Sequence, residues 1–144
     1  MRETATTKLE FSQGYSFKVD FGTKNIQSLV VDESTPVGEG SGPNPTQLLS
    51  ASVGHCLSSS LIYCLRKARI TLKGLNTTVR ANVERNEEGR LRVKNIDTQI
   101  RLDVDEKDKK RVTRCLEVFE NYCTVTQSVR KGIEVKVSIE TNSH

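Results

Sequence analysis

The sequence predicts an α+β fold in which antiparallel strands are wrapped on one long central helix. Short strand-like segments occur near both ends of the chain, at residues 6–20 and 133–139. Between them lies a segment without a formal charge, residues 40–65, whose apolar residues recur at spacings of three and four. Alternating segments that predict strands and segments with helical spacing follow one another in the order βββ-α-ββ-αα-β. We expect a single domain over residues 1–144.

The first three strands are predicted at residues 6–12, 15–20 and 26–32. A turn at Gln13-Gly14 joins the first two strands, because glycine is typical of tight connections between strands. The segment STPVGEGSGPNP that follows the third strand is rich in Gly, Pro and Ser, which indicates a loop. It is the longest irregular stretch in this prediction, and such loops often carry functional residues.

A long central helix is predicted over residues 45–69. Asn44 is a favoured N-cap, Pro45 suits the first helical position, and Gln47 stands where a capping box has Glu or Gln. Residues 48–65 contain five serines, a glycine and a histidine. This polar content favours a buried helix of a soluble protein over a membrane span.

The second half of the chain is predicted to form a hairpin, two helices and a last strand. The hairpin covers residues 75–85 and 90–104, and it turns at 86–89. A helix then begins near Asp105, and its apolar face is formed by Val112, Cys115, Leu116 and Phe119. A short helix follows Cys123 and stops at Gly132, and the closing segment IEVKVSIE alternates as a strand does.

Charge and cysteine content narrow the class of protein. The net charge is +4, but the basic residues are spread along the chain and form no stripe of the kind that binds nucleic acid. The N-terminal residues contain no apolar core of a secretory signal. Four cysteines in 144 residues are too few for a disulfide scaffold. We therefore expect a cytoplasmic protein with neither nucleic-acid nor membrane partners.

Two cysteines stand in settings that suit a redox pair. Cys56 lies in the uncharged helical segment, and Cys123 lies in NYCTVTQSVRKG, where the free N–H groups of the next helix favour a thiolate. An ordinary thiol has a pKa of about 8.5, so an attacking cysteine needs a positive neighbour. His55 is a poor candidate, since consecutive helical residues point about 100° apart. Judged by its own segment alone, Cys56 is more simply interpreted as a small core residue.

The other two cysteines are interpreted as structural, because Cys64 and Cys115 lie on apolar helix faces. Cys64 follows Cys56 by two helical turns, a rise of about 12 Å, which is too far for a direct disulfide. The cysteines and His55 lack the close spacing of a zinc site. We therefore predict no metal and no cofactor.

Two motifs, GSGPNPTQLLSASVGHC and YCTVTQSVRKGIEVKV, resemble the signature of the OsmC/Ohr family of hydroperoxide reductases. In that family a Gly-rich loop and an Asn-Pro lead into a central helix that bears the first cysteine. The second cysteine comes much later, followed by a hydroxyl residue, a short helix and a final strand. The element order of this chain matches that pattern over essentially its whole length.

The resemblance implies an OsmC-like fold and an intertwined homodimer with two equivalent sites at the subunit interface. It implies that Cys56 is the peroxidatic cysteine and Cys123 the resolving one. The implied activity is the reduction of hydroperoxides to alcohols in defence against oxidative stress. The apolar helix around Cys56, lined by small residues, favours organic hydroperoxides over hydrogen peroxide as a hypothesis. The small-molecule hydroperoxide oxidises Cys56 to a sulfenate, Cys123 converts the sulfenate to a disulfide, and an external dithiol reduces the disulfide.

The sequence departs from the family at two supporting positions. Well-studied members have a glutamate directly after Asn-Pro and an arginine in the N-terminal hairpin. Here the first position is Thr46, and the hairpin turn SQGYS has no arginine. Glu39 is the candidate replacement for the glutamate, and Arg2 and Arg130 are candidate cations. The alternative function is a non-catalytic module of the same fold that binds an apolar ligand in the dimer-interface pocket.

Overall fold

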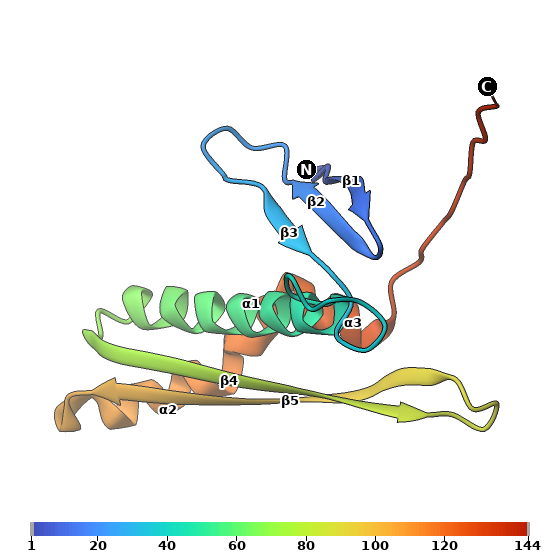
Figure 1. Ribbon diagram of the computed structural model, residues 1–144. Helices are drawn as coiled ribbons and strands as arrows, with labels where there is room; N and C mark the ends of the chain where they lie inside the picture. Colours follow the sequence, from blue (N-terminus) through green and yellow to red (C-terminus); the bar gives the residue numbers. More distant parts are fainter. Residues whose placement is uncertain (1, 144) are drawn as a thin grey trace. The chain divides into compact units, whose positions relative to one another are not determined.

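The computed structural model describes residues 2–143 and confirms the α+β fold (Figure 1). In the N-terminal half, β1 (Lys8–Gln13), β2 (Ser16–Asp20) and β3 (Leu29–Val31) precede α1 (Pro45–Lys67). The hairpin of β4 (Leu72–Arg85) and β5 (Leu91–Val104) follows. The remaining elements are the 3-10 helix η1 (Glu106–Asp108), α2 (Lys109–Val118), the 3-10 helix η2 (Phe119–Tyr122) and α3 (Thr124–Lys131).

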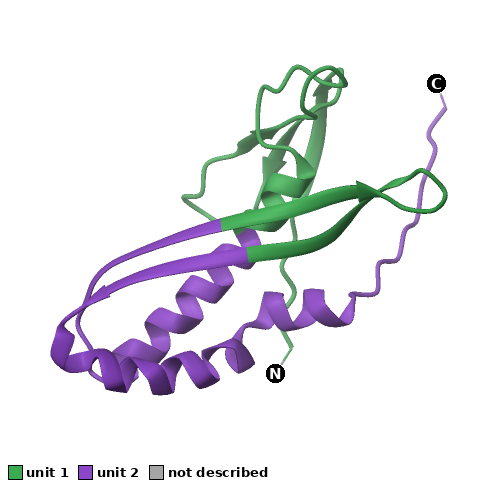
Figure 2. Ribbon diagram, turned by 90° about the horizontal axis from the view of Figure 1, so that it is seen from below, with its two compact units in different colours: residues 1–51, 79–97 green, residues 52–78, 98–144 purple. Residues whose placement is uncertain are grey.

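The chain folds as two compact units, shown in two colours in Figure 2. Unit 1 comprises Met1–Ala51 and Val79–Asp97, and unit 2 comprises Ser52–Thr78 and Thr98–His144. Helix α1 and the two strands of the hairpin each pass from one unit into the other.

In unit 1, β1, β2 and β3 form an antiparallel sheet in that order. Phe11 pairs with Phe17, and their rings meet edge to face with centroids 5.7 Å apart. The turn between β1 and β2 lies where the sequence predicts it. Gly14 in this turn has a φ of 54°, a conformation that glycine adopts without steric cost.

The loop between β3 and α1 folds around the buried carboxylate of Asp32. The Ser41 hydroxyl, which donates to this carboxylate at 2.8 Å, contributes most to holding the pKa of Asp32 below its ordinary value. Gly42 is required in the loop because a Cβ there would lie 2.0 Å from the Val30 carbonyl oxygen. Three backbone N–H groups also donate to the Asp32 carboxylate, those of Glu33, Glu39 and Ser41.

Helix α1 begins with the predicted capping box. The Asn44 side-chain oxygen accepts from the Gln47 N–H at 2.8 Å, and the Gln47 side-chain oxygen accepts from the Asn44 N–H at 2.9 Å. The helix has the length and composition of a membrane span, with a mean hydropathy of 1.4 over its most apolar window. A core helix of a soluble protein passes the same test, and Leu57, Leu61 and Leu65 are buried at spacings of four.

In unit 2, one polar contact joins the end of α1 to the start of α2. Arg111 donates to the Ala68 carbonyl oxygen at 2.6 Å, and it also forms a local ion pair with Asp108 at 2.7 Å. The bond to Ala68 places the start of α2 beside the end of α1. The predicted apolar face of α2 is confirmed except at Leu116, which is 47% exposed.

The last predicted strand is not formed within this chain. Residues 132–143 carry no strand assignment, and they extend away from α3 (Figure 1). Their alternation is intact, but the four apolar side chains are exposed: Ile133, Val135, Val137 and Ile139. A strand needs a hydrogen-bonded neighbour, and among the described residues none pairs with this segment.

Candidate active site

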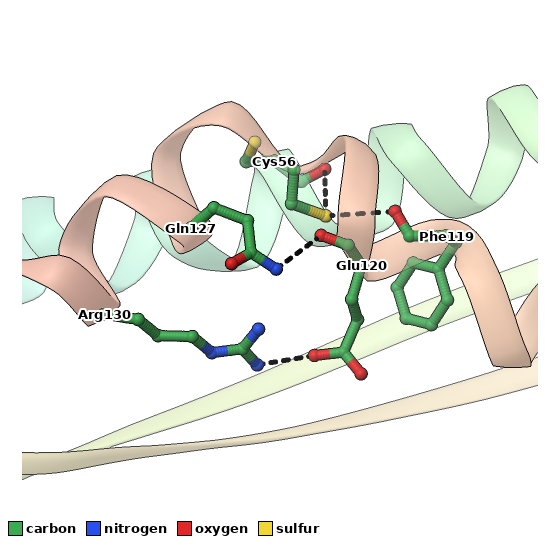
Figure 3. Close-up of polar contacts among 6 residues, drawn as sticks. Cys56, Phe119, Glu120, Gln127 and Arg130 are labelled. Carbon is green, nitrogen blue, oxygen red and sulfur yellow. Dashed lines mark hydrogen bonds and ion pairs between the residues drawn. The ribbon is translucent and has the colours of Figure 1, made fainter.

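The structure brings Cys56 and Cys123 together, although 67 positions separate them in the sequence. Cys123 lies between η2 and α3, and its side chain is completely buried. Its Sγ lies 3.6 Å from the carbonyl oxygen of Phe119 and 3.9 Å from that of Cys56 (Figure 3). Both cysteines belong to unit 2. The Cys123 thiol therefore packs against the turn of α1 that carries Cys56.

Cys56 is the more accessible member of the pair, since its side chain is only partly buried. Ser60 lies one helical turn further along α1, and its hydroxyl is near enough to the Cys123 sulfur to lower the pKa of that thiol. Cys123 thus has two neighbours, Cys56 and Ser60, on one face of α1.

Two opposite charges lie close to Cys123. Arg130 of α3 forms an ion pair with Glu120 of η2 at 2.5 Å, and both side chains are about half exposed. Gln127 also donates its side-chain amide to the Glu120 carbonyl oxygen at 3.0 Å. Figure 3 shows Arg130 and Gln127 pointing toward Glu120, so these contacts join η2 to α3 on either side of Cys123.

The prediction that the start of α3 favours a thiolate at Cys123 is wrong. Cys123 does occupy the N-cap position of α3, but its side chain makes no capping hydrogen bond to that helix. Burial raises the pKa of the Cys123 thiol, and the nearby Cys56 and Glu120 raise it further. The Ser60 hydroxyl and the charge of Arg130 lower it, but the net shift is upward.

The remaining candidates from the sequence are divided between the two units. Arg130 shares unit 2 with both thiols, whereas Glu39 and Arg2 belong to unit 1. Glu39 is exposed and lines a pocket of about 330 Å³, together with the β1–β2 turn and the loop after β3. Thr46, at the family's glutamate position, accepts a hydrogen bond from Ser50 through its carbonyl oxygen. The supporting role of Glu39 stays a prediction.

Sequence reasoning missed Ser60 and Glu120, and it missed that Cys64 and Cys115 are neighbours. The Cys115 thiol is buried, and the side chain of Cys64 lies near enough to raise the pKa of that thiol. The sequence does contain one signal for the second pair of cysteines. Cys56 and Cys64 are eight residues apart, and so are Cys115 and Cys123, as expected if two antiparallel segments meet at both pairs.

Comparisons with known proteins agree with this architecture. An OsmC-like protein of unknown function from Vibrio cholerae has a TM-score of 0.72 at 10% identity, covering 88% of this chain and 94% of that chain. An organic hydroperoxide resistance protein from Elizabethkingia anophelis has a TM-score of 0.67 at 17% identity, covering 99% of both chains. A third, the organic hydroperoxide resistance protein OhrB of Bacillus subtilis, has a TM-score of 0.61 at 17% identity, covering 93% and 96%.

At these identities the solved structures establish the fold. No curated protein sequence matches the chain. The family model described as OsmC-like protein matches residues 38–138, a range that contains the Gly-rich loop, the long helix and all four cysteines. Because this range is more than half of the sequence, the chain belongs to the OsmC-like protein family.

Proposed function

We propose that this protein reduces organic hydroperoxides to alcohols, with Cys56 as the attacking thiol and Cys123 as the resolving thiol. The observation that carries the proposal is the position of the Cys123 sulfur, 3.9 Å from the Cys56 carbonyl oxygen. A sulfur in this place lies against the helical turn that carries Cys56, where an oxidised Cys56 side chain would have to be resolved. The organic hydroperoxide resistance proteins of the same fold support the choice of substrate.

Accessibility supports the assignment of the two roles. Cys56 is partly exposed and can meet a peroxide, whereas Cys123 is fully buried. Burial also keeps Cys123 protonated at neutral pH, since it raises the pKa of that thiol. A buried, protonated thiol is a poor first nucleophile, but it is protected until its neighbour has reacted.

The proposed cycle has three steps. The Cys56 thiolate attacks the peroxide oxygen that bears hydrogen, the O–O bond breaks, and the other oxygen leaves as the alcohol after protonation. Cys123 then attacks the Cys56 sulfenic acid, forms the S–S bond and releases water. An external dithiol finally reduces the disulfide by thiol–disulfide exchange. These thiols stay reduced between cycles in the cytoplasm, where we place the protein.

The ion pair beside Cys123 is proposed to tune the second step. Replacing Arg130 with glutamine removes a charge that lowers the pKa of Cys123 and frees Glu120 to raise it, so disulfide closure is expected to slow at neutral pH. Glu120→Gln removes a charge that raises the pKa of Cys123, so disulfide closure is expected to shift to lower pH. Rapid-quench measurement of disulfide closure over a range of pH tests both variants. The difference between each variant and the wild type is expected to shrink at high salt. Coincident pH profiles would contradict the role of the pair.

We further propose that the protein functions as a homodimer. The exposed alternation of residues 133–139 has the pattern of a strand with one apolar face, but no described segment of the chain pairs with it. A second copy supplies the missing neighbour most simply, because an unpaired strand tends to add to another sheet.

Disulfide mapping tests the proposed function. Reduced protein receives one equivalent of cumene hydroperoxide, and the expected product is a single Cys56–Cys123 disulfide. Chymotrypsin is the suitable protease. It cleaves after Leu57 and Tyr63 between the first two cysteines, and after Phe119 and Tyr122 between the last two. Trypsin leaves each of these pairs in one peptide, since no Lys or Arg separates them.

The same experiment distinguishes the alternative. If both thiols stay reduced under excess peroxide, the chain is better interpreted as a binding module for an apolar ligand. Hydrogen peroxide serves as the comparison oxidant. It is expected to close the disulfide more slowly than cumene hydroperoxide, because apolar side chains such as Leu57 and Leu61 lie on the helix that carries Cys56.

A further inference from the structure

One face of α1 carries a row of small residues, each four positions after the last, which places them on successive turns of the helix. The row consists of Cys56, Ser60 and Cys64, and Ala68 continues it directly after the last residue of the helix. The two ends of the row, Cys56 and Ala68, contact the segment that runs from α2 to Cys123, and between them Ser60 and Cys64 lie near enough to shift the pKa values of Cys123 and Cys115. Because all four are small, the two backbones can approach closely along the whole row.

The contacts of this row follow an antiparallel register. They join Ala68 to Arg111, Cys64 to Cys115 and Cys56 to Cys123. A step of four or eight residues back along α1 is thus matched by the same step forward along the facing segment. The two thiol pairs therefore lie at two levels of one helix–helix contact, separated by two turns or about 12 Å.

We propose that Cys64 and Cys115 are a second redox pair, which closes a disulfide between α1 and α2 when a hydroperoxide is in excess. Cys64 is partly exposed and meets the oxidant, while Cys115 is buried beside it. This division into one accessible and one buried thiol repeats the arrangement of Cys56 and Cys123. The pair is too far along α1 to serve as the resolving partner of Cys56.

The chemistry requires only the two thiols and one hydroperoxide. The Cys64 sulfur attacks the peroxide, the O–O bond breaks, and an alcohol leaves. The Cys115 sulfur then forms the S–S bond with the Cys64 sulfenic acid, and water is released. Two thiols are oxidised, and one hydroperoxide is reduced to an alcohol and water.

The second pair is expected to react more slowly than the first. Burial raises the pKa of Cys115 to about 11, and the nearby side chain of Cys64 adds to this shift. Its thiolate is therefore scarce at neutral pH, and closure is expected to accelerate as the pH rises toward 9.

The test uses the full-length variant Cys56→Ser/Cys123→Ser, in which only the second pair remains. The folded variant is titrated with diamide, which takes two hydrogens from a pair of thiols. We expect loss of both thiols, one intramolecular disulfide between the chymotryptic peptides of Cys64 and Cys115, and a rise in Tm that a reductant reverses. Free thiols after prolonged treatment, or disulfides between chains only, would overturn the proposal.

A matched control adds Cys64→Ser to the same variant, and its Tm is expected not to change with diamide. Because Cys123 is buried, its replacement threatens folding, so the wild-type protein provides a second measurement. With excess cumene hydroperoxide, its peptide map is expected to contain the Cys64–Cys115 disulfide, and absence of that disulfide counts against the pair. Since the double variant lacks both residues of the proposed peroxidase, its result stands or falls separately from that function.

Discussion

Replacing Cys56 with serine is expected to lower hydroperoxide reduction by roughly three orders of magnitude or more, because a serine hydroxyl stays protonated at neutral pH and does not attack an O–O bond. The measurement is the consumption of cumene hydroperoxide in the presence of a dithiol. Cys64→Ser is the matched control, since it makes the same substitution two turns along the same helix. That control is expected to keep the wild-type rate at low peroxide.

The Cys123→Ser variant separates attack from resolution. It is expected to reduce about one equivalent of peroxide per chain and then stop, because the Cys56 sulfenic acid has no thiol partner. Dimedone should label this sulfenic acid at Cys56, and prolonged exposure should convert it to the sulfinic acid. Full turnover by either Cys56→Ser or Cys123→Ser would contradict the assigned roles.

The second large effect is expected in the C-terminal segment. Val135 and Val137 are 80% and 79% exposed, and burying a side chain of this kind contributes about 1.5–3 kcal/mol. If a second copy covers this face, Val135→Lys/Val137→Lys places two charges in an apolar interface and converts the dimer to a monomer. Sedimentation velocity measures the change directly.

The matched control places the same number of lysines on the other face of the segment. Glu134→Lys/Ser138→Lys is expected to leave the dimer intact, because alternate residues of a strand point to opposite sides. Equal loss of the dimer in both variants would indicate a general charge effect. A wild-type monomer, or an intact dimer in Val135→Lys/Val137→Lys, would contradict the proposed role of this face.

Local signals in the sequence predict the elements of this fold well. Asn44 and Gln47 mark the start of α1, and the structure contains both hydrogen bonds of their capping box. Gly132 marks the end of α3, as predicted. These signals succeed because a helix end must satisfy its own free backbone groups with nearby residues. The alternation of residues 133–139 is also a local signal and predicts the closing strand, but a strand requires a hydrogen-bonded neighbour as well.

The candidate site is only partly predictable, because its properties depend on contacts between distant segments. The family resemblance selects Cys56 and Cys123, and the structure brings them together. The pKa of Cys123 could not be predicted from its place at the start of α3, since burial is the largest cause of its upward shift and the side chain makes no capping hydrogen bond. Glu120 likewise gains its importance from Arg130, which lies ten positions later on another element.

The matched spacing of the four cysteines has a consequence for handling the protein. In the unfolded chain any two thiols can join, and four cysteines allow three complete pairings. The folded register permits one of them, in which the loop closed by Cys64 and Cys115 is nested inside the loop closed by Cys56 and Cys123. Air oxidation before folding would trap the other two pairings, whose disulfides hold the two helices apart. Refolding therefore belongs under reducing conditions, with oxidant added only afterwards.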